Sequence, residues 1–158
     1  MTRDFTPIPL AALALGLAGL IPFWAAVVLL IQNSDGTYSP AAEMWFFTIY
    51  STLIAGFLGG VRWGQAISAP GTPGPIVLTG SIMPSLVGLL ALLVHWLGQP
   101  ATAWAIMSVC YAALLLWDRF AIRNSDLPGW YGLLRIVLTT GVVLAHLAIS
   151  FAYVALVL

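Results

Sequence analysis

Residues 44–67 read MWFFTIYSTLIAGFLGGVRWGQAI and carry a single charged side chain, that of Arg62. A helix of about 20 mainly apolar residues is long enough to cross the hydrocarbon core of a bilayer. The segment therefore predicts a transmembrane helix with an arginine near its end. Four further segments of the same kind flank it, at about residues 9–31, 76–97, 102–121 and 131–156. Together they predict an all-α, polytopic membrane protein, a bundle of five transmembrane helices.

The composition places the chain in the membrane class. Of its 158 residues, 61% are apolar and 6% are charged, whereas charged residues make up about 25% of a typical soluble domain. The spans use most of the chain, so we expect residues 1–158 to form one integral domain in the lipid bilayer. The formal charge is zero and lysine is absent, which excludes a general attraction to nucleic acid. Cys110, the lone cysteine, predicts neither a disulfide nor a metal site.

All the basic residues fall on one side of the membrane once the spans are drawn: Arg3, Arg62, Arg119, Arg123 and Arg135. Positive charge is retained on the cytoplasmic face during insertion, so the N-terminus is predicted to be inside and the C-terminus outside. Arg3 is offset by Asp4 and the first apolar run is longer than that of a signal peptide, so we expect no cleavage. The lack of an Arg- and Ser-rich transit peptide favours a multi-pass protein of a bacterial inner (cytoplasmic) membrane.

The polar residues of four spans fall on one face each, because a helix turns about 100° per residue. These predicted interior faces are Thr48, Ala55, Gly59 and Arg62; Ser81, Ser85, Gly88 and His95; Trp104, Met107, Tyr111 and Asp118; and Arg135, Thr139, His146, Ser150 and Tyr153. Polar groups are unfavourable against lipid, so we expect the four faces to point at one another. The polar side chains on these faces either form hydrogen bonds between helices or line a pathway for protons or a ligand.

His95 and His146 are the two histidines of the chain. Counted from the inner ends of their spans, they lie about 28 and 20 Å up, at 1.5 Å per residue. An offset of roughly 8 Å disfavours a shared haem, so we predict no cofactor and no metal. The sequence has no paired catalytic carboxylates, H-E-x-x-H motif, nucleophile elbow or phosphate loop, and we expect no enzymatic activity.

Gly56, Gly60 and Gly64 form two overlapping G-x-x-x-G steps in the second span. This spacing lets another helix approach closely, because no side chain intervenes. We predict a helix-packing surface, with a neighbouring span of the same chain as its partner. A homodimer is the alternative.

The inner ends of the spans hold the main functional candidate. Arg62 lies 18 residues after Met44 and Asp118 lies 16 residues after Thr102, so both reach a depth of about 24–27 Å. We therefore predict an ion pair between Arg62 and Asp118. The predicted ligand site around them is Arg62, Trp63, Asp118, Arg119, Arg123, Trp130, Tyr131 and Arg135. Its excess of arginine suits an anionic headgroup or a carboxylate. The alternative is that the arginines only set the topology and pair with Asp118 and Asp126.

Several segments of the chain carry a family resemblance. They are GFLGGVRWG (residues 56–64), IMPSL (82–86), WDR (117–119), LPGWYGLLR (127–135) and IPLAALALGLAGLIPF (8–23). With them the chain resembles the uncharacterised family called domain of unknown function 3429, whose eukaryotic relatives include the mitochondrial transmembrane protein 69. The resemblance covers nearly the whole chain and implies a five-helix membrane protein. It implies no activity.

Two functional interpretations follow from these features. A non-catalytic accessory or assembly protein would pack against a larger membrane complex through its glycine and aromatic surfaces, and it needs no ligand site. The alternative is a binder or carrier of a hydrophobic anionic molecule at the inner Arg/Trp cluster, such as an anionic lipid, a quinone or a tetrapyrrole.

Overall fold

The computed structural model describes residues 7–33, 39–124 and 127–157. This part of the chain is helical and contains no β-strand. Its helices in chain order are α1 (Leu10–Ala18), α2 (Ile21–Gln32), α3 (Ala41–Ser68), α4 (Pro75–Trp96), α5 (Pro100–Arg123) and α6 (Gly129–Val157). The all-α class predicted from the sequence is thereby confirmed.

Five segments of the described chain are long and apolar enough to cross a membrane: Leu10–Gln32, Ala41–Ser68, Pro75–Trp96, Pro100–Arg123 and Gly129–Leu156. The predicted bounds differ from these by at most three residues, the largest difference being at the start of α3. Apolar length decides where a span lies, and length can be read directly from the sequence. The five-span prediction is confirmed.

The first span is interrupted, which the sequence interpretation missed. α1 ends before Gly19, and α2 begins at Ile21 with Pro22 in its first turn. Proline has no backbone N–H, so the hydrogen-bond ladder of a continuous helix cannot pass through this point. The Tyr50 hydroxyl of α3 donates to the Gly19 carbonyl at 3.0 Å. A side chain of the neighbouring helix therefore supports the backbone at the break.

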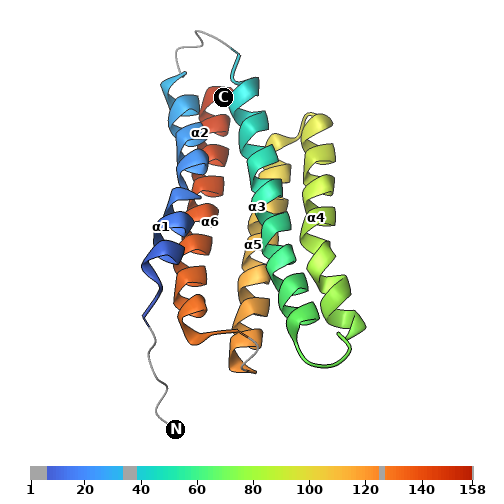
Figure 1. The fold of residues 1–158 in the computed structure, drawn as a ribbon. Coiled ribbons are helices and arrows are strands. Elements are labelled where there is room, and N and C mark those ends of the chain that lie inside the picture. The colour runs from blue at the N-terminus through green and yellow to red at the C-terminus, as the bar shows by residue number, and fades with distance from the viewer. Residues whose placement is uncertain (1–6, 34–38, 125–126, 158) are drawn as a thin grey trace.

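The helices stand side by side in one bundle, in which α3 is central (Figure 1). α3 packs against α2, α4 and α5, while α6 packs against α2 and α5. The C-terminal ends of α3 and α5 and the N-terminal ends of α4 and α6 meet at one end of the bundle. All described arginines lie toward this end, namely Arg62, Arg119, Arg123 and Arg135. We call it the arginine end.

α3 and α4 approach each other closely at Gly59 and Gly88. A Cβ atom at Gly59 would collide with the Ser81 carbonyl of α4, and one at Gly88 would collide with the Thr52 side chain of α3. Thr52 Oγ1 donates to the carbonyls of Thr48 and Gly88, at 3.0 and 3.4 Å. The absence of side chains at the two glycines is what allows this packing.

The predicted packing within the chain is not seen for two of the three glycines, Gly60 and Gly64. A Cβ at Gly56 would contact Ser85 Oγ at 3.1 Å, but Gly60 and Gly64 have no other part of the described chain within 4 Å of such an atom. Gly60 is one residue beyond Gly59, so it is turned by about 100° toward the lipid-facing side of α3. Spacing alone identified a glycine-rich helix but not the side on which the neighbour packs.

We predict opposite effects for Gly59→Ala and Gly60→Ala. The first places a methyl group against the α4 backbone and should destabilise the fold by about 1–3 kcal/mol. The second meets open space and should be neutral or stabilising by up to about 1 kcal/mol, because alanine favours helix. Thermal unfolding of the purified proteins in detergent measures both effects. Equal midpoints for the two variants would contradict the α3–α4 contact described above.

Candidate functional site

Three residues of the predicted cluster gather inside the arginine end: Arg62, Asp118 and Arg135 are each only 3% exposed. Trp130 and Tyr131 at the start of α6 are half-buried, with their rings 6.0 Å apart in an edge-on arrangement. The remaining predicted residues, Trp63, Arg119 and Arg123, are exposed. Trp63 and Arg119 directly follow Arg62 and Asp118, so helix rotation turns them outward.

Asp118 pairs with Arg135. The Arg135 Nε donates to Asp118 Oδ2 at 2.7 Å, and both side chains are buried. This is the one ion pair in the described residues; Arg3 and Asp126 lie outside them. The predicted Arg62–Asp118 pair is wrong. Depth along the spans placed the two residues at similar levels, but α5 packs more extensively against α6 than against α3, and Arg135 reaches the carboxylate first.

Arg62 turns instead toward α4 and α5. Its guanidinium lies 4.8 Å from the centre of the Trp117 ring, a cation–π arrangement. Its Nη1 donates to Gln65 Oε1 at 3.1 Å. Its Nε is buried and has no hydrogen-bond partner in the described chain. The arginine is thus held in place by neutral groups, while the nearby carboxylate is committed to Arg135.

A hollow of about 200 Å³ opens beside Arg62. Its wall is formed by the last turns of α3, by the turn that leads to α4 and by the first turn of α4; the lining residues are Arg62, Gln65, Ala66, Ala69, Pro70, Gly71, Thr72, Pro73, Gly74 and Val77. We call it the Arg62 pocket. The N–H groups of Val77 and Leu78 already bond to the Gly74 carbonyl. The N-terminus of a helix nonetheless carries partial positive charge, which adds to that of Arg62.

Sequence reasoning missed Gln65 and Trp117 as partners of Arg62. Gln65 follows Arg62 by three residues, which puts the two side chains on neighbouring positions of one helix face. That signal was present in the sequence. The Trp117 contact was not readable, because it depends on how α5 packs beside α3.

Most residues of the predicted interior faces are buried. Every residue chosen on α3 and α5 is buried, as are Ser81, His95, Arg135, Thr139 and His146. Ser150 and Tyr153 are half-buried. Ser85 is exposed and is a correction. The buried side of α4 is centred on Pro84, Gly88 and His95, and a 100° step per residue carries Ser85 past its edge.

Two hydrogen-bonded groups occupy the half of the interior away from the arginine end. His146 Nδ1 lies 2.8 Å from the Val142 carbonyl, so this nitrogen must be the donor. A neutral His146 therefore accepts at Nε2 from the Ser51 hydroxyl, at 2.9 Å. Tyr111 donates to the Ser51 carbonyl at 2.8 Å. Two of these hydrogen bonds join neighbouring helices, and the bond to the Val142 carbonyl fixes the His146 ring within α6. Such hydrogen bonds stabilise the packing of the helices.

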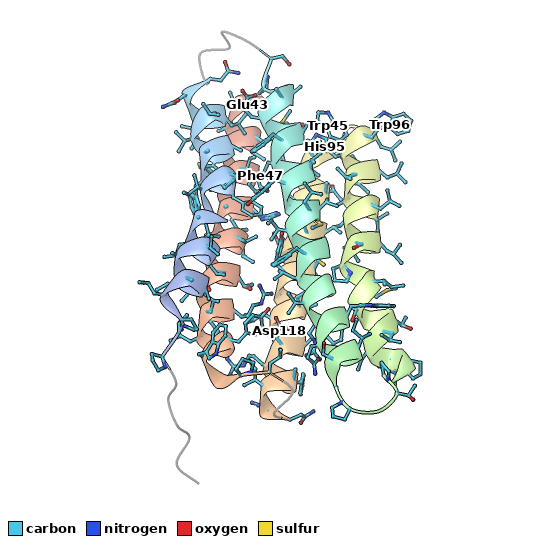
Figure 2. The ribbon with its side chains drawn as sticks, viewed as in Figure 1. Glu43, Trp45, Phe47, His95, Trp96 and Asp118 are labelled. Atoms are coloured by element: carbon cyan, nitrogen blue, oxygen red, sulfur yellow. The ribbon has the colours of Figure 1, made fainter. Side chains whose placement is uncertain are left out.

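The second group is centred on Thr48, three residues before Ser51 on α3. Thr48 Oγ1 lies 2.7 Å from His95 Nδ1 and accepts from Trp104 Nε1 at 2.9 Å. The His95 ring stacks on Trp45, with 4.1 Å between ring centres, and both lie at the end of the bundle opposite Asp118 (Figure 2). The two histidines thus bind hydroxyls of residues that are about 4.5 Å apart along α3.

Apolar residues separate these groups from the charged cluster. Ala55 and Leu58 lie between Ser51 and Arg62 along α3, and Val142 lies between Thr139 and His146 along α6; all three are buried. The arrangement favours interhelical hydrogen bonding over a continuous pathway, the two alternatives that the sequence left open.

A family model described as "Protein of unknown function (DUF3429)" matches residues 8–151. The chain belongs to this family. It is 40% identical to Transmembrane protein 69 of Xenopus tropicalis over 134 residues, and 33% identical to Transmembrane protein 69 of Mus musculus over 133 residues. Each match covers 83% of the chain and 50% or 51% of the relative, so the chain spans about half the length of the curated relatives it matches. No solved structure matches.

The chain is thus a protein with several candidate membrane spans that belongs to a family of unknown function. The printed names of the relatives state no activity, ligand or partner. Both relatives are vertebrate proteins, so a bacterial inner membrane is not confirmed. That location and the inside position of the N-terminus stay predictions.

For the Asp118–Arg135 pair we predict strong coupling. Asp118→Asn or Arg135→Gln leaves a buried charge without its partner, which should destabilise the protein by about 3–5 kcal/mol. The double variant removes both charges and should be more stable than either single variant. Unfolding in detergent measures this cycle, with the exposed Arg119→Gln as a control that should change little. Additive effects of the two substitutions would contradict a direct pair.

Proposed function

We propose that this DUF3429 protein binds an anionic group of a membrane-borne molecule in the Arg62 pocket. The observation that carries the proposal is the state of Arg62, which is 3% exposed, lines a hollow of about 200 Å³ and has an Nε without a partner in the described chain. A charged side chain this close to the hydrocarbon core requires a counter-charge or access to water. The nearest internal carboxylate, Asp118, is bonded to Arg135.

The chemistry of the pocket suits an anion. Arginine offers donors in a planar fork that matches a carboxylate or phosphate. The Gln65 amide and the Thr72 hydroxyl add donors to the lining. The first turn of α4 adds the positive end of a helix dipole. No carboxylate, imidazole or thiol belongs to the lining residues, which supports binding rather than catalysis in this pocket.

The position of the pocket supports a membrane-borne ligand. Arg62 lies six residues before the end of α3 at Ser68, so it is about 9 Å inside the end of the helix. α3 has 28 residues and is about 42 Å long, so in a bilayer with a hydrocarbon core of about 30 Å this depth lies near the boundary between headgroups and hydrocarbon. The arginine end carries more arginines than acidic residues, so it attracts anionic lipids in general. The Arg62 pocket would then bind one of these lipids specifically.

The test is thermal unfolding of the purified protein in an uncharged detergent, with sodium phosphate as the probe and sodium chloride at equal ionic strength as the reference. A ligand that binds only the folded state raises its stability. Phosphate should therefore raise the unfolding midpoint of the unsubstituted protein and of Arg119→Gln, but not that of Arg62→Gln. Arg119 is the matched control because it is an exposed arginine at the same end. A response that Arg62→Gln retains would refute the proposal.

The accessory or assembly role is the second candidate, and the lipid-facing side of α3 favours it. Each glycine inside a helix lowers helix stability by about 1 kcal/mol relative to alanine. The close approach of α4 explains Gly59, whereas nothing in the described chain lies near Gly60 or Gly64. With the exposed Phe57 beside them, these two glycines suit contact with a helix of another subunit.

For this second role we predict that Gly60→Leu/Gly64→Leu releases a partner. The two leucines would hold a neighbouring helix away, while the monomer fold should survive because they meet open space. Native mass spectrometry after mild extraction measures the co-extracted subunits or dimer. Ala112→Leu, an equivalent enlargement at an exposed position of α5, should leave them bound. Identical assemblies in both variants would rule out this surface.

A further inference from the structure

A second hollow lies between α4 and α5, within the membrane-spanning part of the bundle. It measures about 740 Å³ and extends from Gly80 and Trp117 to Leu90 and Thr102. The other lining residues are Met83, Pro84, Val87, Ala105, Ile106, Val109, Cys110, Ala113 and Leu114. Met83, Leu90 and Val109 are exposed, so the hollow is a groove that opens toward lipid. We call it the α4–α5 groove.

The groove is apolar. Hydrocarbon and aromatic side chains form almost all of its wall, the exceptions being the Thr102 hydroxyl at one end and the Cys110 thiol. Glycine and alanine at positions 80, 105 and 113 leave the space that larger residues would fill. Apart from these two groups the wall offers no donor or acceptor for a polar ligand, so the groove suits a hydrocarbon.

The groove adjoins the Arg62 pocket at Trp117. The indole of Trp117 lines the groove, and the Arg62 guanidinium lies 4.8 Å from its ring centre. Along α4, Val77 lines the pocket and Gly80, about one turn further, lines the groove. The end of the Trp117 ring packs against the Gly80 position, where an added Cβ would come within 2.8 Å of it. The polar and apolar hollows therefore meet at one side chain.

The order of the two hollows matches the orientation of a lipid. The pocket lies at the arginine end, and the groove continues from it for ten residues of α4, about 15 Å toward the opposite face. We propose that the anion bound at Arg62 is the headgroup of a lipid-like molecule, and that one of its hydrocarbon chains lies in the α4–α5 groove. This inference rests on the proposed function and specifies the class of ligand.

A lipid is the occupant that the neighbouring Arg62 pocket favours, because it carries an anionic headgroup and a hydrocarbon chain on one molecule. The chain would lie against the Trp117 ring on which Arg62 rests. Binding of the tail and of the headgroup would then support each other through one indole.

The test uses nanodiscs of phosphatidylcholine that contain about one-tenth phosphatidic acid, followed by native mass spectrometry of the released protein. The unsubstituted protein should retain phosphatidic acid, and Arg62→Gln should lose this preference. Ala113→Phe, which fills the groove, should reduce the retained lipid at least fivefold. Ala112→Phe should not, because Ala112 is an exposed neighbour that does not line the groove.

The outcomes separate the two proposals. If Ala113→Phe retains phosphatidic acid as well as Ala112→Phe does, the chain is not in the groove and this inference is wrong, while stabilisation by free phosphate through Arg62 would still support the pocket. If neither phosphate nor phosphatidic acid depends on Arg62, the proposed function is wrong and the inference falls with it.

A second measurement does not depend on the folding of the groove variant. Phosphatidic acid with a photoreactive group in its acyl chain is incorporated into the same nanodiscs with the unsubstituted protein. Peptides of α4 and α5 that contain Met83, Ile106 or Val109 should carry the adducts. Labelling confined to α2 or α6 would overturn the inference.

Discussion

The buried ion pair between Asp118 and Arg135 is the interaction on which the arginine end depends. Two arginines and one carboxylate are enclosed there, each 3% exposed. Asp118 Oδ2 binds Arg135 Nε at 2.7 Å, and this contact joins α5 to α6. It leaves Arg62 as a buried cation held by a ring face and an amide. Because an unpaired charge is unfavourable inside a membrane, the cluster as a whole is one anion short of neutrality.

The packing of α3 against α4 determines where the Arg62 guanidinium lies. Gly59 and Arg62 are three residues apart, so they lie about 60° apart around the helix. The approach of the α4 backbone at Gly59 therefore brings the first turn of α4 beside Arg62. The side chain is confined between α3, the start of α4 and Trp117. A glycine chosen for close packing thus also shapes the polar pocket one turn below it.

Properties that vary along the helix axis could be predicted from the sequence, and properties that depend on neighbours could not. Apolar length predicted the five spans, and the 100° period predicted most of the buried polar residues, with Asn33 and Ser51 missed. The similar depth of Arg62 and Asp118 followed from counting residues. The pairing of Asp118 with Arg135 did not, because it depends on which helix lies beside α5. The same limitation explains why Gly60 and Gly64 were predicted to pack against a neighbouring span, although Gly59 already belonged to the predicted interior face. Pro22 was a signal for the break in the first span, because proline interrupts the backbone hydrogen bonds of a helix. The signal was overlooked because the apolar residues continue without interruption through this point.

The two sides of α3 place different demands on its sequence. Exposed positions recur along the helix at residues 46, 49, 53, 57, 60, 63 and 67, while residues 47, 48, 51, 55, 58, 59, 62 and 66 are buried. The buried set touches three other helices, so each change there has to be accommodated by several neighbours at once. Among related sequences, substitutions should therefore be frequent at the exposed positions of α3 and rare at the buried positions. Gly60 is one of these exposed positions, with nothing else of the described chain within 4 Å of an added Cβ. If this position proves invariant, a contact outside this chain would be the cause.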